Sequence, residues 1–591
     1  MHSPSLKITL ALLVLLTWLG AGLRVFHLDD VPLRGDEAFS VRVWAQPPAD
    51  TWNDLAAEEP HPIGTFITFW AWKNIAGESE FAMRALPMLV NLLGVALMMA
   101  LARRLIGAGS AAWMLGLLWA VNPFLIWHAQ DVRNYALWAV LSPLAMWLFL
   151  VALERNRRRD WTLYAVAEFA AFHAFLLEPF FLLTQGLYLI TFRRERLKSA
   201  LVTWLALAVT LVPWMIQVVR LSGSGYGGTA ARADLAELVR RFVPTLLFGE
   251  GELSLVAGAS LLIVLAAGLV AGRRRNLDKR VLLLLWAFLP LILLVIFSTR
   301  MNVFRPRYVI PITPPILLGF LWTAFRAGGR SQRFPVLSSL VTVALLGGGL
   351  ISLYAYLYSD PPKAPDWRSL ASYLDTRATA DDFVILANVD PAFGYYYRGP
   401  ANELPFSEVD SPQNILAENT GVYVQVADST FDISIALQEE AQFIPPAIEL
   451  VKQYRAWEVD AAEIEHPLDM TLGDVAILRG YSVLGGDQFG LTVLLYWEPL
   501  RRTETEYVGF LHVTAPGESA VIAQDDHAPL NGSAPTTAWI PGDLLRDPFA
   551  VTLPPGTYVL KVGMYESESS RRLDILNADG NSVELQVITL E

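Results

Sequence analysis

Eleven apolar runs, each close to the length of one bilayer crossing, dominate the first 357 residues. They lie at residues 8–26, 83–101, 107–127, 135–153, 161–177, 179–192, 199–219, 254–272, 281–298, 308–325 and 335–357. A transmembrane helix needs about 20 apolar residues, and tilt or a kink permits fewer. Pro179 separates two short runs, because proline disfavours helix in the residue before it. The first run lacks a small-residue cleavage site, so we interpret it as a retained helix rather than a signal peptide. The pattern predicts a multi-spanning α-helical membrane bundle of about eleven helices over residues 1–357.

Charge in the loops predicts how this bundle is oriented. Basic clusters occur at residues 103–104, 155–159, 193–198, 273–280 and 326–333. With eleven crossings, all of them fall on the same side as Lys7. The positive-inside rule assigns that side to the cytoplasm. We therefore expect a multi-pass protein of the plasma (inner) membrane, with a cytoplasmic N-terminus and an extracytoplasmic C-terminal part.

The hydropathy pattern changes after residue 357. Residues 358–455 mix helical and strand periodicity, which predicts a small soluble α/β domain. Residues 456–591 alternate apolar and polar positions in short runs separated by turn residues, which is typical of a β-sandwich. The sandwich could contact a glycan or another acceptor, or serve a structural role.

Composition narrows the chemistry. The net charge of -12 is concentrated in the second part of the chain and offers no basic face, which argues against nucleic acid as a partner. The chain has no cysteine, so disulfides, thiolate metal sites and a cysteine nucleophile are excluded. Nothing in the sequence indicates the oligomeric state.

Charged residues at the predicted outer rim are the candidates for function, because ionisable groups at membrane depth are costly. Asp36 and Glu37 follow the first run and could supply a general base or hold a metal. Outer-rim arginines suit a phosphate group, although an arginine that reaches toward lipid head groups is an equally good explanation. These arginines are Arg133, Arg305 and Arg307. His61, close to Glu59, could bind a metal or relay a proton, or could simply mark the entry to the second span.

The order of these motifs resembles a known group of enzymes. Gly35-Asp36-Glu37 and His61-Pro62 are followed by the segments 77–87, 122–123 and 130–137, then by Phe172-His173 and Arg307-Tyr308. The series is similar to the GT-C integral-membrane glycosyltransferases, and especially to the protein O-mannosyltransferase and aminoarabinose-transferase-like group related to glycosyltransferase family 39. The resemblance covers roughly residues 8–325.

This resemblance implies a GT-C-like bundle and an inverting transfer of a sugar. The donor would be a polyprenyl-phosphate-linked sugar, and the acceptor would be an extracytoplasmic glycan, lipid or protein. Asp36 matches the catalytic base of the first outer loop, with Glu37 beside it, and the three arginines would bind the donor phosphate. Some relatives hold a divalent metal near the acid, which makes Glu59 and His61 candidate ligands; Tyr135 and His173 would lie near the substrate or metal. The sequence departs from the family pattern at Ile63, where a second proline is usual.

Two other functions stay open from the sequence. A transporter or flippase for a lipid-linked sugar would also be multi-spanning, although such proteins often contain internal repeats and the halves of this chain show none. A membrane-anchored carbohydrate-binding protein would use the sandwich, but eleven spans greatly exceed what an anchor requires.

Overall fold

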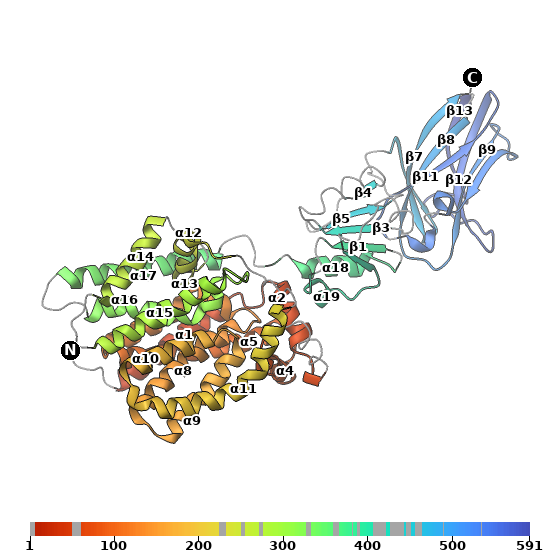
Figure 1. The fold of residues 1–591 in the computed structure, drawn as a ribbon. Helices are drawn as coiled ribbons and strands as arrows, with labels where there is room; N and C mark the ends of the chain where they lie inside the picture. Colours follow the sequence, from red (N-terminus) through yellow and green to blue (C-terminus); the bar gives the residue numbers. More distant parts are fainter. Residues whose placement is uncertain are drawn as a thin grey trace. The chain divides into compact units, whose positions relative to one another are not determined.

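The computed structural model describes residues 6–49, 61–223, 232–249, 255–270, 276–326, 333–358, 364, 366–380, 382–386, 390–405, 421–425, 442–444, 451–455, 464–487, 490–532, 535–539 and 541–590. The chain divides into two compact units, Met1–Pro365 and Asp366–Glu591. The first is helical and the second is built mainly from sheets (Figure 1).

Each predicted apolar run corresponds to a helix or a pair of helices among the described residues of the first unit. The corresponding helices are α1 (Leu6–Val25), α5 (Glu80–Leu105), α6 (Gly109–Val121) with α7 (Pro123–Ala129), α8 (Tyr135–Arg155), α9 (Arg158–Ala174), α10 (Pro179–Phe192), α11 (Leu197–Gly223), α14 (Leu255–Val270), α15 (Leu277–Phe297), the 3₁₀ helix η4 (Pro306–Ile312) with α16 (Thr313–Arg326), and α17 (Arg333–Tyr358).

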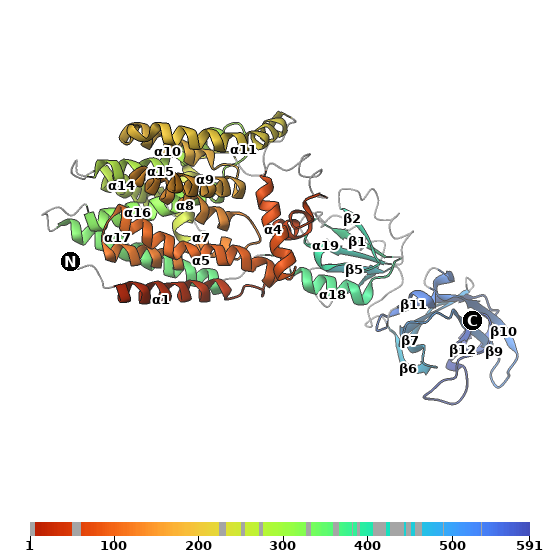
Figure 2. The ribbon, with the colours of Figure 1, turned by 90° about the horizontal axis from the view of Figure 1, so that it is seen from below.

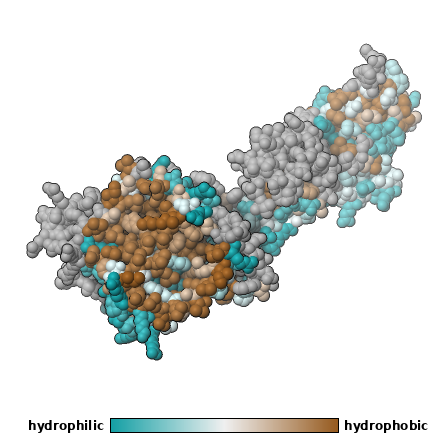
Figure 3. All heavy atoms as spheres, in the orientation of Figure 1, coloured by the Kyte–Doolittle hydropathy of each residue, from teal (hydrophilic) through white to brown (hydrophobic). Residues whose placement is uncertain are grey.

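The helices form a multi-pass membrane bundle. Among the described residues, six helices are long and apolar enough to cross a membrane, and the bent pair α6 and α7 raises this to seven. Exposed apolar side chains cover the visible face of the bundle, as suits a surface solvated by lipid (Figure 3). Trp18 on α1 and Val209 on α11, which are 74% and 69% exposed, are examples. The predicted number of eleven crossings and the side of each loop stay predictions.

A bend of 56° separates α6 from α7. Pro123 lacks the N–H that would bind the carbonyl of Trp119 one turn earlier. Arg24 of α1, which is fully buried, donates to that carbonyl at 3.2 Å and to the Ala120 carbonyl at 2.9 Å. Asn122 caps α7 by accepting from the Leu125 N–H at 2.9 Å. The bend redirects the chain toward residues 130–134, which enter the site described below.

The loop between the first two predicted spans contains short helices that the hydropathy pattern did not predict. Among its described residues these include α2 (Gly35–Phe39), the π-helix η1 (Ser40–Trp44) and α4 (Ile63–Ala76). His61-Pro62 therefore introduces α4 and not the second span, because Pro62 is the N-cap of a helix that ends before α5 begins. Figure 2 shows α4 lying across the end of the bundle, steeply inclined to the long helices.

Three further short helices, α12 (Leu235–Glu237), η3 (Leu238–Phe242) and α13 (Val243–Phe248), precede α14. They contribute buried side chains to the main core of the bundle, among them Phe242, Val243 and Leu246.

The second unit begins with a mixed sheet of order β2-β1-β3-β5-β4. Its elements are α18 (Trp367–Arg377), β1 (Asp382–Leu386), α19 (Phe393–Tyr396), β2 (Asn402–Pro405), β3 (Gly421–Gln425), β4 (Gln442–Ile444) and β5 (Val451–Arg455). β1 pairs in parallel with β2 and β3, whereas β5 is antiparallel to β3 and β4. This arrangement agrees with the α/β pattern of the sequence.

Two four-stranded antiparallel sheets follow, with orders β10-β9-β12-β13 and β11-β8-β7-β6. The strands are β6 (His466–Leu472), β7 (Ala476–Asp487), β8 (Gly490–Pro499), β9 (Tyr507–Thr514), β10 (Val521–His527), β11 (Leu545–Val551), β12 (Gly556–Glu566) and β13 (Val583–Leu590). Trp497 of one sheet and Leu511 of the other belong to one shared buried cluster, which makes the pair a β-sandwich. The predicted domain boundaries at 357/358 and 455/456 stay predictions.

Candidate functional site

Asp36 and Glu37 occupy the first turn of α2, but their side chains have opposite surroundings. Glu37 is only 1% exposed, whereas the side chain of Asp36 is 48% exposed. The α2 N-terminus is closed by a backbone N–H of Arg34 that donates to Glu37 Oε2 at 3.1 Å. This hydrogen bond, which is the carboxylate half of a capping box, turns Glu37 inward and leaves Asp36 on the open side of the helix.

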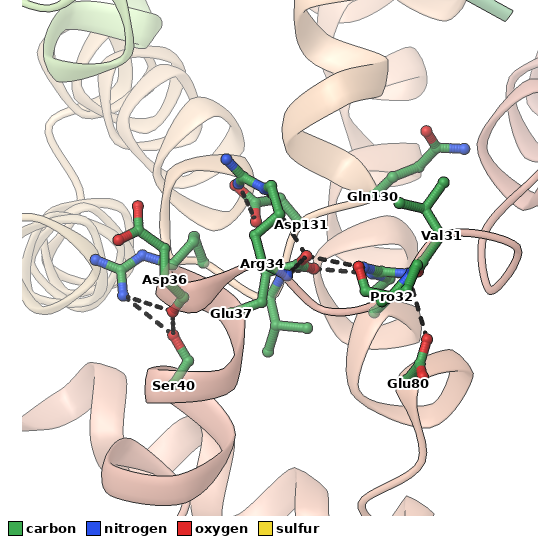
Figure 4. Close-up of polar contacts among 12 residues, drawn as sticks. Val31, Pro32, Arg34, Asp36, Glu37, Ser40, Glu80, Gln130 and Asp131 are labelled. Carbon is green, nitrogen blue, oxygen red and sulfur yellow. Dashed lines mark hydrogen bonds and ion pairs between the residues drawn. The ribbon is translucent and has the colours of Figure 1, made fainter. Parts of the chain in front are cut away.

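Glu37 forms a buried ion pair with Arg84 of α5 (Figure 4). Nε and one terminal nitrogen of the guanidinium donate to the two carboxylate oxygens at 2.8 Å each. Glu37 Oε1 also accepts from the backbone N–H of Val132 at 3.0 Å. Arg84 uses its remaining donors on the carbonyls of Leu28, Val31 and Pro32 at 2.8, 2.8 and 3.1 Å. The pair thus joins the first outer loop to α5 and to residues 130–134.

A second ion pair closes the other side of this loop. Arg34 lies 2.7 Å from Asp131 Oδ1, and its guanidinium stacks over the ring of Trp127 at 5.4 Å. Burial alone would lower the pKa of Arg34, but the carboxylates of Asp131 and Glu37 raise it. Arg34 therefore remains charged and holds the segment after α7 against the loop.

Asp36 faces two arginines that belong to segments far apart in the sequence. Arg307 of η4 lies 3.7 Å from Asp36 Oδ2. Arg133 donates to the Asp36 carbonyl at 3.2 Å and to Ser40 Oγ at 3.1 Å, and its guanidinium lies 4.1 Å from the ring centroid of Trp44. The Nε atoms of both arginines are buried and have no hydrogen-bond partner in the described part of the chain. Buried cationic donors without acceptors suit an anionic ligand.

Aromatic rings surround the charged groups. Tyr135 and Tyr308 stack with centroids 6.1 Å apart, and the Arg307 guanidinium lies 5.1 Å from the Tyr135 ring. Phe175 contacts both tyrosines, with centroids 5.4 Å from each. These rings limit the freedom of Arg307 and partly shield its charge from water, which strengthens its interaction with any nearby anion.

The structure brings most of the predicted residues together. The His61 ring lies 5.2 Å from Trp44 and 5.8 Å from Phe175, so His61 belongs to the same cluster as Arg133. Arg305 is the N-cap of η4 with an exposed side chain, and of the two η4 arginines it is Arg307 that pairs with Asp36.

His173 lies where α9 meets α4. Its Nδ1 accepts from the backbone N–H of Gly64 at 3.3 Å, and a Cβ at Gly64 would lie 2.5 Å from the His173 Cβ. Thr65 Oγ1 donates to the His173 carbonyl at 2.7 Å. These contacts give His173 a packing function, and glycine at position 64 permits the close approach of the two helices.

Of the two candidate metal ligands, His61 lies among the described residues. Glu59 lies outside the described residues. Within the described ranges, no group of three or more His, Asp and Glu side chains could hold a metal ion. A metal site at Glu59 and His61 therefore stays a prediction.

Several site residues were not identified from the sequence. Arg84, Arg34, Asp131, Trp44 and Ser40 all contact the predicted groups. Arg84 could have been identified from the sequence, because it is a charged residue near the start of an apolar run. The others look like ordinary loop residues until the fold places them beside Asp36.

Comparisons with known proteins concern the family and the fold. Residues 60–218 match the family model described as dolichyl-phosphate-mannose-protein mannosyltransferase. The fold is similar to the crystal structure of ArnT from Cupriavidus metallidurans in the apo state, with TM-score 0.52, 16% identity, and coverage of 75% of this chain and 97% of that one. The same enzyme bound to undecaprenyl phosphate gives TM-score 0.48 and 17% identity, with coverage of 76% and 98%. No curated protein matches the sequence significantly. The predicted resemblance to this group of membrane glycosyltransferases is confirmed, and with it the predicted enzyme class.

Proposed function

We propose that the protein transfers a sugar from a polyprenyl-phosphate donor to an extracytoplasmic acceptor, with inversion at the anomeric carbon and with Asp36 as the general base. The observation that carries this proposal is a half-exposed carboxylate that pairs with Arg307, beside a buried arginine, Arg133, in one ring-lined cluster. The family that matches residues 60–218 is described by a mannose donor on dolichyl phosphate, which belongs to the same chemical class.

The reaction assigns one function to each group. Asp36 takes the proton of the acceptor hydroxyl as its oxygen forms a bond to the anomeric carbon. The bond from that carbon to the phosphate oxygen breaks, and its electron pair leaves with the polyprenyl phosphate. The phosphate gains negative charge as it departs, from about -1 as a diester toward -2 as a monoester. Arg307 and Arg133 stabilise this developing charge, since their unused donors already lie in a low-dielectric cluster.

Glu37 has a different function in this proposal. Its oxygens already accept from Arg84, Arg34 and Val132, so no lone pair is directed toward a substrate. Glu37 is a positioning residue that fixes α2, and Asp36 alone acts on the acceptor.

The test is turnover by the purified protein with defined polyprenyl-phosphate sugars, among them mannose and aminoarabinose donors, and with membrane extracts as the source of acceptor. Asp36→Asn is expected to lower kcat by about 10²- to 10⁴-fold, the usual contribution of a general base. Asp29→Asn, an exposed carboxylate of the same loop, is the matched control and should leave turnover unchanged. Retained activity in Asp36→Asn would exclude it as the base. Movement of donor across liposomes without any product would instead favour the flippase.

A further inference from the structure

A groove lies at the end of the bundle opposite the Asp36 site. It is bounded by α1, α5 and α8 and has a volume of about 440 Å³, within the range of roughly 300–1,000 Å³ typical of ligand sites. Leu13, Met99 and Trp147 are among its apolar walls, and Thr9, Arg103 and Arg104 are its polar lining. None of these residues takes part in the proposed transfer reaction.

The length of α5 separates this groove from the transferase site. Arg84, which anchors the first outer loop, and Arg103, which lines the groove, are 19 positions apart on this helix. At 1.5 Å per residue the two arginines are about 29 Å apart along the helix axis, close to the thickness of the hydrocarbon core. The groove therefore opens at the level of the other leaflet, on the side that the basic loops predict to be cytoplasmic.

The two arginines of the groove differ in their partners. Arg104 is neutralised by Glu154 at 2.6 Å and also donates to the Leu150 carbonyl at 2.9 Å. Arg103 is exposed and donates to Thr9 Oγ1 at 2.8 Å, and no carboxylate of the described residues pairs with it. One guanidinium thus has an uncompensated positive charge at the polar end of an otherwise apolar groove.

We propose that this groove binds one anionic glycerophospholipid of the leaflet opposite the transferase site. The lipid phosphate would bind Arg103 beside the Thr9 hydroxyl, since a guanidinium presents its donors in a geometry that fits phosphate. The upper part of an acyl chain would lie along Leu13, Met99 and Trp147. Charge complementarity selects this occupant, because an apolar molecule would leave the Arg103 charge uncompensated and the ammonium group of a zwitterionic lipid would add a second positive charge beside it.

Binding in this groove connects the two helices that flank the loop carrying Asp36. α1 and α5 pack together, and α1 leads into the loop that Arg84 of α5 anchors. A lipid that contacts both helices at their far ends would favour their packed arrangement. By linkage, the bound lipid stabilises the folded bundle in proportion to its occupancy.

The test is native mass spectrometry of the purified, delipidated full-length protein titrated with dioleoyl phosphatidylglycerol or dioleoyl phosphatidylcholine. Phosphatidylglycerol is expected to occupy one site more tightly than the others, and Arg103→Gln should weaken that site about fivefold, the typical effect of one basic residue on an anionic lipid. Arg159→Gln, an exposed arginine on the same predicted side but outside the groove, is the control and should leave the site intact.

A second variant separates the groove from general surface charge. Ala96→Trp adds bulk at an exposed position that lines the groove and keeps every charge. It should abolish the tight site while melting temperature without lipid stays close to that of the wild type. The proposal is overturned if the two arginine variants weaken binding equally, if both lipids bind with the same affinity, or if Ala96→Trp binds phosphatidylglycerol as the wild type does.

Discussion

Replacing Glu37 with glutamine tests whether its buried pair with Arg84 holds the loop that carries Asp36. All partners of the carboxylate are donors: two guanidinium nitrogens and the backbone N–H groups of Arg34 and Val132. A glutamine keeps one acceptor oxygen but replaces the other with an NH₂ group, which must then face a donor. Arg84, whose side chain is only 3% exposed, would lose its hydrogen-bonded counterion and keep only the more distant ion pair with Glu80, at 3.9 Å.

The magnitude follows from this burial. Removing one partner of a buried ion pair costs about 3–5 kcal/mol, because the other charge is left uncompensated. At 1.36 kcal/mol per factor of ten, the open form of the loop should become about 10²- to 5 × 10³-fold more populated, and the remaining charge of Glu80 favours the lower end. Hydrogen exchange at the amides of Glu37 and Ala38 measures how often the α2 turn opens, because both amides donate to the Arg34 carbonyl at 2.9 Å in the closed turn.

Hydrogen–deuterium exchange in detergent or nanodiscs measures this change directly. In Glu37→Gln, protection should fall at residues 34–44 and at Val132, whereas α8 and α15 should keep theirs. Turnover should fall as well, since Asp36 is no longer held in position. Asp36→Asn is the matched control, because it should lower turnover without changing protection. An increase in exchange of less than tenfold, or one spread evenly through the bundle, would refute the reasoning.

Three further predictions concern other charged groups. Arg307→Gln should lower kcat by about 10²- to 10³-fold with little change in melting temperature, because it removes a donor aimed at the leaving phosphate; steady-state kinetics with a defined donor tests this, and an unchanged kcat would contradict it. Arg24→Met should destabilise the bundle by at least about 1–3 kcal/mol, since the Trp119 carbonyl at the α6–α7 bend is left without a donor; thermal unfolding in detergent should show it, and Lys7→Met should not. Burial alone would lower the pKa of His527, but hydrogen bonds and charge from Asp547 and Asp525 raise it above 6.5. Their stabilisation is complete below about pH 6.5 and is lost as the pH rises through the raised pKa, so the melting temperature of the second unit should fall relative to His527→Gln over that range; equal pH dependence of the two proteins would contradict this.

Much of the membrane part could be predicted from the sequence. Every apolar run is helical, because a long apolar segment has no other way to satisfy its backbone in lipid. The sandwich strands followed from alternating polarity, as at β8 and β9, where one face enters the shared core. The helix α4 was missed because its residues lack the length of a span, so hydropathy alone left it within a loop.

The candidate site shows what sequence reasoning can and cannot reach. Asp36, Arg133 and Arg307 were identified because each is a charge at the rim of an apolar run. The different surroundings of Asp36 and Glu37 were not predictable, since both are acids in the same turn and only the position of Arg84 separates them.

The sequence by itself determined the class of protein, the helical runs and the presence of charges where charge is costly. Those properties depend on composition and local periodicity, which are read along the chain. The tertiary structure decided which charged and polar groups meet. Arg307 contacts Asp36 although the two residues are 271 positions apart, and Arg24 of α1 donates to the Trp119 carbonyl that Pro123 leaves without its helical donor. Contacts of this kind depend on how helices pack and bend, and an ion pair or an unused donor acquires its function only when burial removes the competing water.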